Sequence, residues 1–559
     1  MPRFRASGIT GFMANAWLIL LIAFIAGVCV FSHSPVRRLI RACAKLTHLA
    51  EHRRIALPLA FIIAVFLGAI PWLLGNIAPP SFHDEFAYLL GADTFAHGRL
   101  TNPTPAFAEH FETFHEIVHP TYQSKFPPGQ SIALFIGQML GAPIIGAFGS
   151  VAVASAAAYW MLRAVLPARW AIAGALLTAI HPLIFVWSQM YWGGGVPLIG
   201  SMLLVGGVLR IARCLRKPTS HAQPCIASIS IGVAIGIFLN TRLLEGGITC
   251  AVVFLWLFAR AIRFSSARVL VKPVLVAFAT LVPILAWMGY YNFRVTGHAL
   301  QLPYLLHTQQ YMRSPLFTWE GELPPKTYAD ERMRRFHEEY EVEEWRTVKQ
   351  NFWQEAGRKL GEYYEAFGGM LLLPLLPVLP RLLRRSWIAR LCLLIAVAFP
   401  VLQIAISVYF RPHYTAPMMG AVILLIVLLL REWTRVRLRN SRIGQAVAYT
   451  ALMMFIVFAA TSVWNDYGNE NRLGSTRQKM IDRLENTAAQ HLILVNYTPR
   501  PQQLFEWVYN SANIDSQPVI WARSLGEAKD RDLLAHYKHR RQWLLTVDFN
   551  TLSPLQRLN

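Results

Sequence analysis

The sequence is poor in charged residues for its length. Asp, Glu, Lys and Arg make up 15% of the 559 residues, whereas apolar residues make up 54% and the mean hydropathy is +0.36. A soluble protein of this size usually carries roughly a quarter charged residues. This composition excludes a disordered, collagenous or disulfide-stapled protein and indicates a chain whose solvent is largely lipid.

Acidic residues are scarce relative to basic ones. The chain has 31 Asp and Glu against 53 Lys and Arg, which gives a net charge of +22. In a soluble chain this excess suggests nucleic acid, but here the basic residues gather in short runs between apolar stretches. Such runs fix the orientation of a multispanning membrane protein, so we exclude nucleic-acid binding.

Cysteine is also rare. None of the cysteines forms a C-x-x-C pair, and none lies in the long loops expected outside the membrane. We therefore expect no disulfide and no cysteine metal site, and the lack of external cysteines favours a bacterial inner membrane. The six cysteines are Cys29, Cys43, Cys214, Cys225, Cys250 and Cys392.

Apolar segments near the ~20 residues that a bilayer requires are numerous. No small-residue cleavage site follows the first of them, so we interpret it as an anchor rather than a signal peptide. A shorter apolar piece at 131–142 follows Pro127-Pro128-Gly129 and is expected to enter the membrane surface. We predict about 12 transmembrane helices, at 10–31, 56–77, 144–165, 170–188, 194–213, 225–241, 246–263, 271–291, 367–383, 388–409, 413–430 and 443–463.

Alternate loops between these spans carry the basic runs. Their only acids are Glu51 and Glu432, so the positive-inside rule places these loops in the cytoplasm. The other loops and the C-terminal tail are then extracytoplasmic, which in a bacterium is the periplasmic side. Three of these external regions are large, at 78–130, 292–366 and 465–559.

The last two external regions differ in pattern. Region 465–559 alternates apolar strands with helical stretches, which predicts a small α/β domain after an all-α polytopic membrane domain at 1–464. Its expected strands are at 491–497, 519–522 and 543–548, with a helix at 527–538. Region 292–366 is helix-favouring, and we interpret its acidic run as a solvated helix face. That run is Glu338, Glu339, Glu341, Glu343 and Glu344.

Two adjacent carboxylates, Asp84 and Glu85, directly follow the second predicted span. Neighbouring residues on a helix point in different directions, so at most one of the two faces a given cavity. One interpretation is a general base at the membrane surface, where burial raises a carboxylate pKa toward use. The alternative is that the pair solvates a turn or caps the following helix.

Lys125 precedes a rigid Pro127-Pro128 pair in the same external region. An ammonium group held at the membrane interface is a candidate phosphate ligand because it is a compact point charge. The alternative is a lysine that extends its charge to the interface ahead of a helix whose first turn accepts proline.

Two further groups lie where spans meet external loops. Arg411 and His413 can hold a phosphate at the outer leaflet, or can form part of an interfacial belt. Arg242 and Glu245 are three residues apart, a spacing at which they can instead pair with each other on a helix.

Residues 115–119 read His-Glu-Ile-Val-His, which matches the H-E-x-x-H pattern of zinc proteases. If this segment acted as it does in those enzymes, His115 and His119 would be zinc ligands one helical turn apart, and Glu116 would activate water. Pro120 directly follows and disfavours a helix at His119. A protease is therefore the weaker interpretation, although these residues stay candidates for a divalent metal.

Taken in order, Asp84-Glu85, Lys125 before Pro127-Pro128 and His413-Tyr414 resemble the motifs of the GT-C-fold membrane glycosyltransferases. The similarity is greatest to the bacterial branch related to protein mannosyltransferases and aminoarabinose transferases. The segment Tyr290-Tyr291-Asn292-Phe293-Arg294-Val295-Thr296-Gly297, followed by Leu302-Pro303-Tyr304, also resembles the start of the later external loop in this branch.

The resemblance implies an inverting transfer of a sugar from a polyprenyl-phosphate carrier at the extracytoplasmic face. It implies Asp84 as the base that deprotonates the acceptor, with Glu85 in a supporting or metal-binding role. Lys125 would bind the donor phosphate, followed in rank by Arg411, His413 and Arg294. The remaining substrate-binding candidates are Tyr88, Tyr122, Tyr414, Arg242 and Glu245.

The resemblance does not decide whether the reaction uses a divalent metal. It also does not decide whether the acceptor is a glycan, a lipid or a protein. The main competing class is a transporter or flippase of lipid-linked sugars. Such proteins tend to place charged groups near the bilayer midplane and often contain internal repeats. Here the ionisable residues lie near the membrane faces and no repeat is evident, so we favour the transferase.

Overall fold

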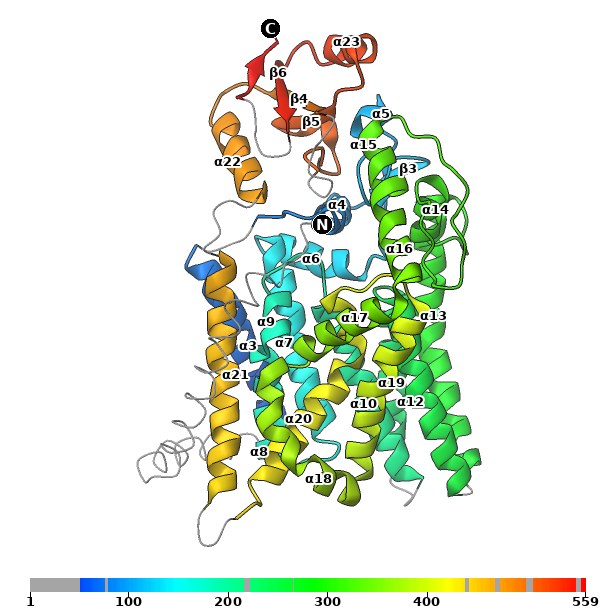
Figure 1. Ribbon diagram of the computed structural model, residues 1–559, viewed down its shortest axis with the longest axis vertical. Coiled ribbons are helices and arrows are strands. Elements are labelled where there is room, and N and C mark those ends of the chain that lie inside the picture. Colours follow the sequence, from blue (N-terminus) through cyan, green and yellow to red (C-terminus); the bar gives the residue numbers. More distant parts are fainter. Residues whose placement is uncertain are drawn as a thin grey trace.

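The structure is a computed structural model that describes residues 51–75, 79–215, 222–264, 266–437, 442–467, 473–498, 506–548 and 554–558. The predicted first span at 10–31 lies outside these residues. A bundle of long helices makes up most of the molecule, and a smaller lobe with a β-sheet stands at one end of it (Figure 1).

Long apolar helices run along the bundle. Within the described residues, seven helices are long and apolar enough to cross a membrane, or eight if the bent pair Phe352–Ala366 and Gly369–Arg385 is one span. Three shorter apolar helices accompany them, so the chain is an integral membrane protein, and the count of about 12 stays a prediction. The bundle helices are α3 (Arg53–Leu73), α7 (Pro143–Leu162), α8 (Ala168–Ile180), α9 (Pro182–Trp187), α10 (Gly195–Cys214), α11 (Ala222–Leu239), α12 (Leu243–Arg263), α13 (Val271–Thr296), α19 (Trp387–Ile406), α20 (Met419–Trp433) and α21 (Ile443–Tyr467).

Burial separates central helices from peripheral ones. The apolar window of the span Pro412–Trp433 is 89% buried, whereas that of Ala267–Thr296, which contains α13, is only 6% buried. Both windows are strongly apolar, so α20 is covered by protein and α13 presents its side chains to lipid. The four cysteines of the described residues are free.

The two long connecting regions, 78–130 and 292–366, fold into short helices and strands at one end of the bundle, and we call this end the loop end (Figure 1). The first external region forms α4 (His83–Ala96), β1 (Asn102–Pro103), α5 (Ala108–Phe111), β2 (Glu116–Ile117), β3 (Thr121–Ser124) and α6 (Gly129–Met139). The second forms α14 (Pro303–Gln310), α15 (Glu331–Arg334), the π-helix η2 (Arg335–Tyr340), α16 (Glu341–Gln350) and α17 (Phe352–Ala366). The remaining short helices are η1 (Ala267–Leu270), η3 (Gly369–Val378), α18 (Leu379–Arg385) and η4 (Pro412–Met418).

The predicted C-terminal α/β domain is present. Its strands pair in the order β5-β4-β6-β7, with β4 parallel to β5 and β6, and β7 antiparallel to β6. The three predicted strands are confirmed as β4, β5 and β6. The domain consists of α22 (Leu473–Glu485), β4 (His491–Tyr497), η5 (Ile514–Ser516), β5 (Val519–Arg523), α23 (Glu527–His536), β6 (Arg541–Val547) and β7 (Gln556–Arg557).

The C-terminal domain does not stand apart from the membrane domain. One apolar cluster joins Leu90 and Phe111 of the first external region to Leu492 and Ile520 of the sheet. The ring of Phe86 also stacks on that of Tyr509, with centroids 4.0 Å apart. The domain is therefore packed on α4 and on the loop that follows it.

Orientation across the membrane is testable by cysteine labelling in a background without native cysteines. We expect Lys529→Cys, in the C-terminal domain, to react with an impermeant maleimide in intact spheroplasts. Arg385→Cys, at the opposite end of the bundle, should react only after permeabilisation, because the positive-inside rule predicts a cytoplasmic position for its basic loop. Both side chains are more than half exposed, so access to the thiol is not limiting. The reverse labelling pattern would contradict the predicted orientation.

Candidate active site

The start of α4 separates the two adjacent carboxylates. Glu85 turns back and accepts hydrogen bonds from the backbone N–H groups of Ser81, Phe82 and Tyr191, at 2.9, 3.3 and 3.2 Å. Free N–H groups at a helix N-terminus favour an acidic partner at this position. Glu85 is therefore a buried cap in this structure, and Asp84 points elsewhere.

A short antiparallel ribbon positions the next two groups. Strands β2 and β3 pair Glu116 with Ser124, and the backbone N–H of Lys125 donates to the carbonyl of His115 at 3.0 Å. His115 and Lys125 thus lie opposite each other at the end of the ribbon. His115 has a φ of 66°, in the left-handed region that costs energy for a residue with a side chain.

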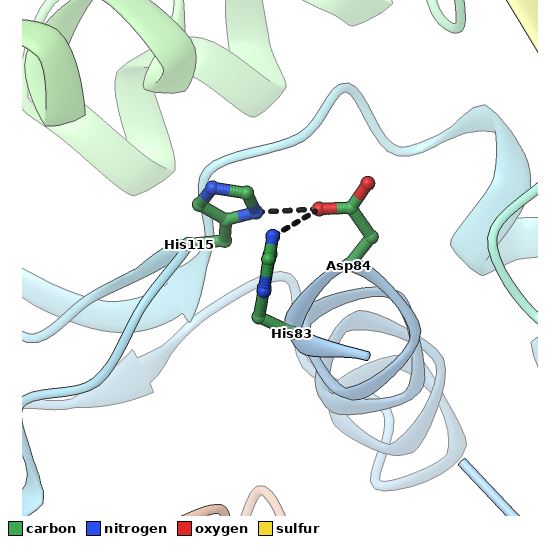
Figure 2. A group of neighbouring side chains, drawn as sticks. All are labelled: His83, Asp84 and His115. Carbon is green, nitrogen blue, oxygen red and sulfur yellow. Dashed lines mark hydrogen bonds and ion pairs between the residues drawn. The ribbon is translucent and has the colours of Figure 1, made fainter. Parts of the chain in front are cut away.

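Two histidines approach the same carboxylate oxygen of Asp84 (Figure 2). Its Oδ1 is 2.5 Å from Nδ1 of His115 and 3.5 Å from Nε2 of His83, and the two imidazole rings meet edge to face. Because a carboxylate only accepts, the imidazole nitrogen of His115 must carry the proton and donate it. His83 comes from the same helix as Asp84, whereas His115 arrives from the ribbon.

The protonation states follow from this arrangement. Burial alone would raise the pKa of Asp84, but the hydrogen bond and charge of His115, with His83, hold that pKa well below its usual range. Burial and the nearby Lys125 ammonium lower the pKa of His115 well below its usual value. At neutral pH the pair is an ionised carboxylate that accepts a hydrogen bond from the N–H of a neutral imidazole.

Lys125 is buried without a counter-ion. Only 3% of the residue is exposed, and within the described residues its ammonium forms no ion pair. It lies 5.2 Å from the ring centre of Tyr304 and 5.5 Å from that of Phe126. Burial lowers the pKa of Lys125 to about 8, although Glu341 and Asp84 nearby favour its charged form. A buried ammonium surrounded by rings is suited to receive an anion.

The second external region supplies the opposite side of the site. Tyr304 and His307, one turn apart on α14, lie toward Lys125 and His115, and the rings of His307 and His115 are 6.1 Å apart. His307 is fully buried, and among the residues that the structure describes neither of its ring nitrogens has a hydrogen-bond partner. His337 follows 5.6 Å beyond it, and its Nδ1 lies 2.7 Å from the carboxylate of Glu341.

This arrangement corrects the interpretation of the acidic run as a solvated helix face. Glu341 is buried beside His337 and influences both Lys125 and His83 electrostatically. Glu344 forms a two-pronged ion pair with Arg411, at 3.1 and 3.3 Å. The interpretation is wrong for these two residues, because the run packs against the loop end instead of facing water along its whole length.

The candidates on the late spans lie on another side of the same site. Arg411 is committed to Glu344, and His413 lies against Trp192 with ring centres 5.2 Å apart. His413 is among the groups whose charge acts on Asp84.

Two other candidates meet beneath the first external region. The guanidinium of Arg242 lies 4.5 Å above the ring of Tyr414, and within the described residues it forms no ion pair with Glu245. Glu245 is buried in the first turn of α12. A backbone hydrogen bond also joins the turn that precedes α12 to the segment that follows Lys125, because the N–H of Gly129 donates to the carbonyl of Asn240 at 2.8 Å. A Cβ on Gly129 would lie 2.6 Å from that oxygen, so only glycine allows the approach.

Tyr88 lies one helical turn after Asp84, and its ring stacks on that of Phe126 with centres 4.6 Å apart. Two other sequence candidates lie apart from the cluster. Arg294 is on the exposed side of α13, where its guanidinium donates to the hydroxyl of Tyr290. Tyr122 points toward the C-terminal domain, and its hydroxyl lies 3.2 Å from both Glu116 and the carbonyl of Asn510.

The H-E-x-x-H segment is not a zinc-protease helix. Glu116 and Ile117 form strand β2, so His115 and His119 do not share a helix face. His119 is exposed, and Glu116 bonds to Tyr122 instead of facing His115. The protease interpretation is therefore not supported.

A different set can hold a metal. His83, Asp84 and His115 each offer one ligand atom, and these atoms lie within 4.8 Å of one another. Two imidazoles and a carboxylate are a donor set that suits a divalent transition metal such as zinc. The same three residues, without a metal, form a carboxylate oriented by two imidazoles.

Sequence reasoning missed His83, His307, His337 and Glu341. His83 directly precedes Asp84, and its position one residue before a helical carboxylate was the only signal available for it. The other three belong to the second external region, and no local pattern indicates that this region folds back over the first.

Comparison with known proteins places the fold. No family model matches the chain, and no curated protein matches it. The apo structure of ArnT from Cupriavidus metallidurans is similar, with a TM-score of 0.52 and 13% identity over 87% of this chain and 92% of that chain. The same protein bound to undecaprenyl phosphate gives a TM-score of 0.51 and 12% identity over the same shares.

A third similar structure is the Archaeoglobus fulgidus oligosaccharyltransferase in complex with zinc and sulfate. It gives a TM-score of 0.45 and 11% identity over 87% of this chain and 67% of that chain. At these identities the likeness concerns the fold, for which we rely on the two ArnT structures. The chain has the GT-C fold that its sequence motifs led us to expect.

Proposed function

We propose that the protein transfers a sugar from a polyprenyl-phosphate carrier to an acceptor at the loop end of the bundle, with inversion at the transferred carbon. The observation that carries this proposal is the meeting of Asp84, His115 and Lys125 at one point of a GT-C fold. A carboxylate and a buried ammonium are the two groups that a direct displacement requires.

In this reaction Asp84 accepts the proton of the acceptor hydroxyl as the oxygen attacks the sugar. The hydrogen bond from His115 fixes the orientation of the carboxylate and leaves its second oxygen for the acceptor. Lys125 neutralises the charge that develops on the departing phosphate. His83, 3.5 Å from the carboxylate, and His413 also favour a low pKa for Asp84 through their positive charge when protonated.

The donor class is supported by the undecaprenyl phosphate bound to the similar ArnT structure. The position of the charges also argues against a flippase as the second candidate. Asp84, Lys125 and Glu341 all lie on the segments of the loop end, and a translocation pathway would require charged groups near the middle of the bundle.

Replacing the base tests the proposed reaction directly. We expect Asp84→Asn to lower turnover by ~10³-fold, because the amide keeps the size but accepts no proton. His115→Ala should lower it by ~10²-fold through loss of orientation. The measurement is the transfer of labelled sugar from a panel of polyprenyl-phosphate sugars to acceptors in membranes that carry the protein. His119→Ala, on the exposed end of the same segment, is the matched control and should retain wild-type turnover. Full turnover in Asp84→Asn would rule out its role as base.

The alkaline limb of the pH profile tests Lys125. Because its pKa is lowered to about 8, the ammonium loses its proton as pH rises through that value. We expect kcat/KM to be highest below pH 8 and to fall above it by about tenfold per pH unit. Lys125→Arg keeps a positive charge at all these pH values and should remove the alkaline limb. An unchanged limb in Lys125→Arg would show that another group titrates.

A further inference from the structure

Arg523, the last residue of β5, lies at the centre of a buried ion network that joins three distant parts of the chain. Its guanidinium donates to Asp330 at 2.9 Å, to Glu506 at 2.8 Å and to the carbonyl of Glu112 at 2.9 Å. Its own carbonyl lies 2.7 Å from Nδ1 of His110. The side chains of Arg523 and Glu506 have no exposed surface.

Glu506 is the second centre of this network. One of its carboxylate oxygens accepts from both Arg523 and Arg332, the latter at 3.2 Å. The other oxygen accepts from the backbone N–H groups of Trp507 and Val508, at 2.8 and 3.0 Å. Every lone-pair direction of this buried carboxylate is therefore used. We call Arg523, Glu506, Arg332 and Asp330 the clamp.

The clamp contacts the two segments that carry His115 and the pair of His337 and Glu341. Glu112, bound through its carbonyl, is three residues before His115. Asp330 and Arg332 lie just before η2 and α16, which carry His337 and Glu341. Between the two segments, the ring of Phe114 stacks on that of Phe336 with centres 3.8 Å apart.

The free energy of burying charges indicates that the clamp fixes the relative position of the segments and adds little to stability. Burying charged groups costs free energy, and apolar residues of similar volume often give equal stability. A buried network in which every charged group has an oppositely charged partner, however, favours one register of the parts that it joins. The apolar contacts between the C-terminal domain and α4 provide affinity, and the clamp decides how the two loop segments sit.

We infer that the C-terminal domain is a positioning element of the active site, which acts through the clamp to hold the His115 segment and the Glu341 segment in register around Asp84 and Lys125. The inference rests on the proposed function for its activity readout only. Its structural content, that the clamp orders residues 110–118 and 330–341, is testable without any substrate.

Glu506→Gln is the main test, because it removes the charge shared by both arginines and keeps the shape of the side chain. By hydrogen exchange and mass spectrometry of the full chain in nanodiscs, we expect at least tenfold faster exchange in both segments. With a donor that the wild type uses, kcat should fall at least tenfold while KM changes less than twofold. Glu506→Asp restores the charge and should recover most of the protection and turnover.

The matched control is Lys529→Gln. Lys529 and Glu109 form an ion pair across the same boundary, but both side chains are about half exposed, so its loss should change neither readout. If Glu506→Gln does not fold, Asp330→Asn removes only the outer member of the clamp and should speed exchange in residues 330–341.

Unchanged exchange in both segments of folded Glu506→Gln, or equal effects of Lys529→Gln, would overturn the clamp. If the wild type uses none of the donors while exchange behaves as expected, the proposed reaction fails and the positioning of the two segments stands. If exchange rises in Glu506→Gln but kcat is unchanged, the segments are ordered by the clamp without a catalytic consequence, and the positioning role is refuted.

Discussion

The site depends on the hydrogen bond between His115 and Asp84, two residues that come from different elements. The start of α4 fixes the position of Asp84. There Glu85 accepts hydrogen bonds from the free backbone N–H groups, and the side chain of Asp84 faces the ribbon. His115 is set by the pairing of β2 with β3, which also brings Lys125 to the same end. The ribbon thus brings both the imidazole that binds Asp84 and the ammonium of Lys125 to the start of α4.

Burial gives these groups their chemical character. A carboxylate, two imidazoles and an ammonium at the edge of a lipid-embedded bundle lack the water that would normally screen them. Their charges are therefore set by one another: His115 keeps Asp84 ionised, and Lys125, which forms no ion pair within the described part of the chain, favours an anion. Phosphate, as the leaving group of a polyprenyl carrier, supplies that negative charge, which is why the pieces fit a transferase better than a protease.

Sequence patterns predicted the bundle, the strands of the C-terminal domain, and Asp84 and Lys125, because span hydropathy, strand alternation and position beside a span are local signals. Sequence patterns did not show that Arg294 is exposed while several neighbouring residues on α13 are buried. That helix is apolar on all sides, so the sequence does not indicate which of its faces packs against the bundle. His307, Glu341 and the docking of Arg523 depend on how distant segments pack, and no spacing along the chain encodes such contacts.

The central claim is a single displacement at the sugar carbon, driven by Asp84 and completed at Lys125. Its most direct test is the anomeric configuration of the product that the wild-type protein forms from a polyprenyl-phosphate sugar of known anomer, read by NMR. A single displacement predicts inversion at the anomeric carbon. A product with retained configuration would require a double displacement through a covalent intermediate and would contradict this account.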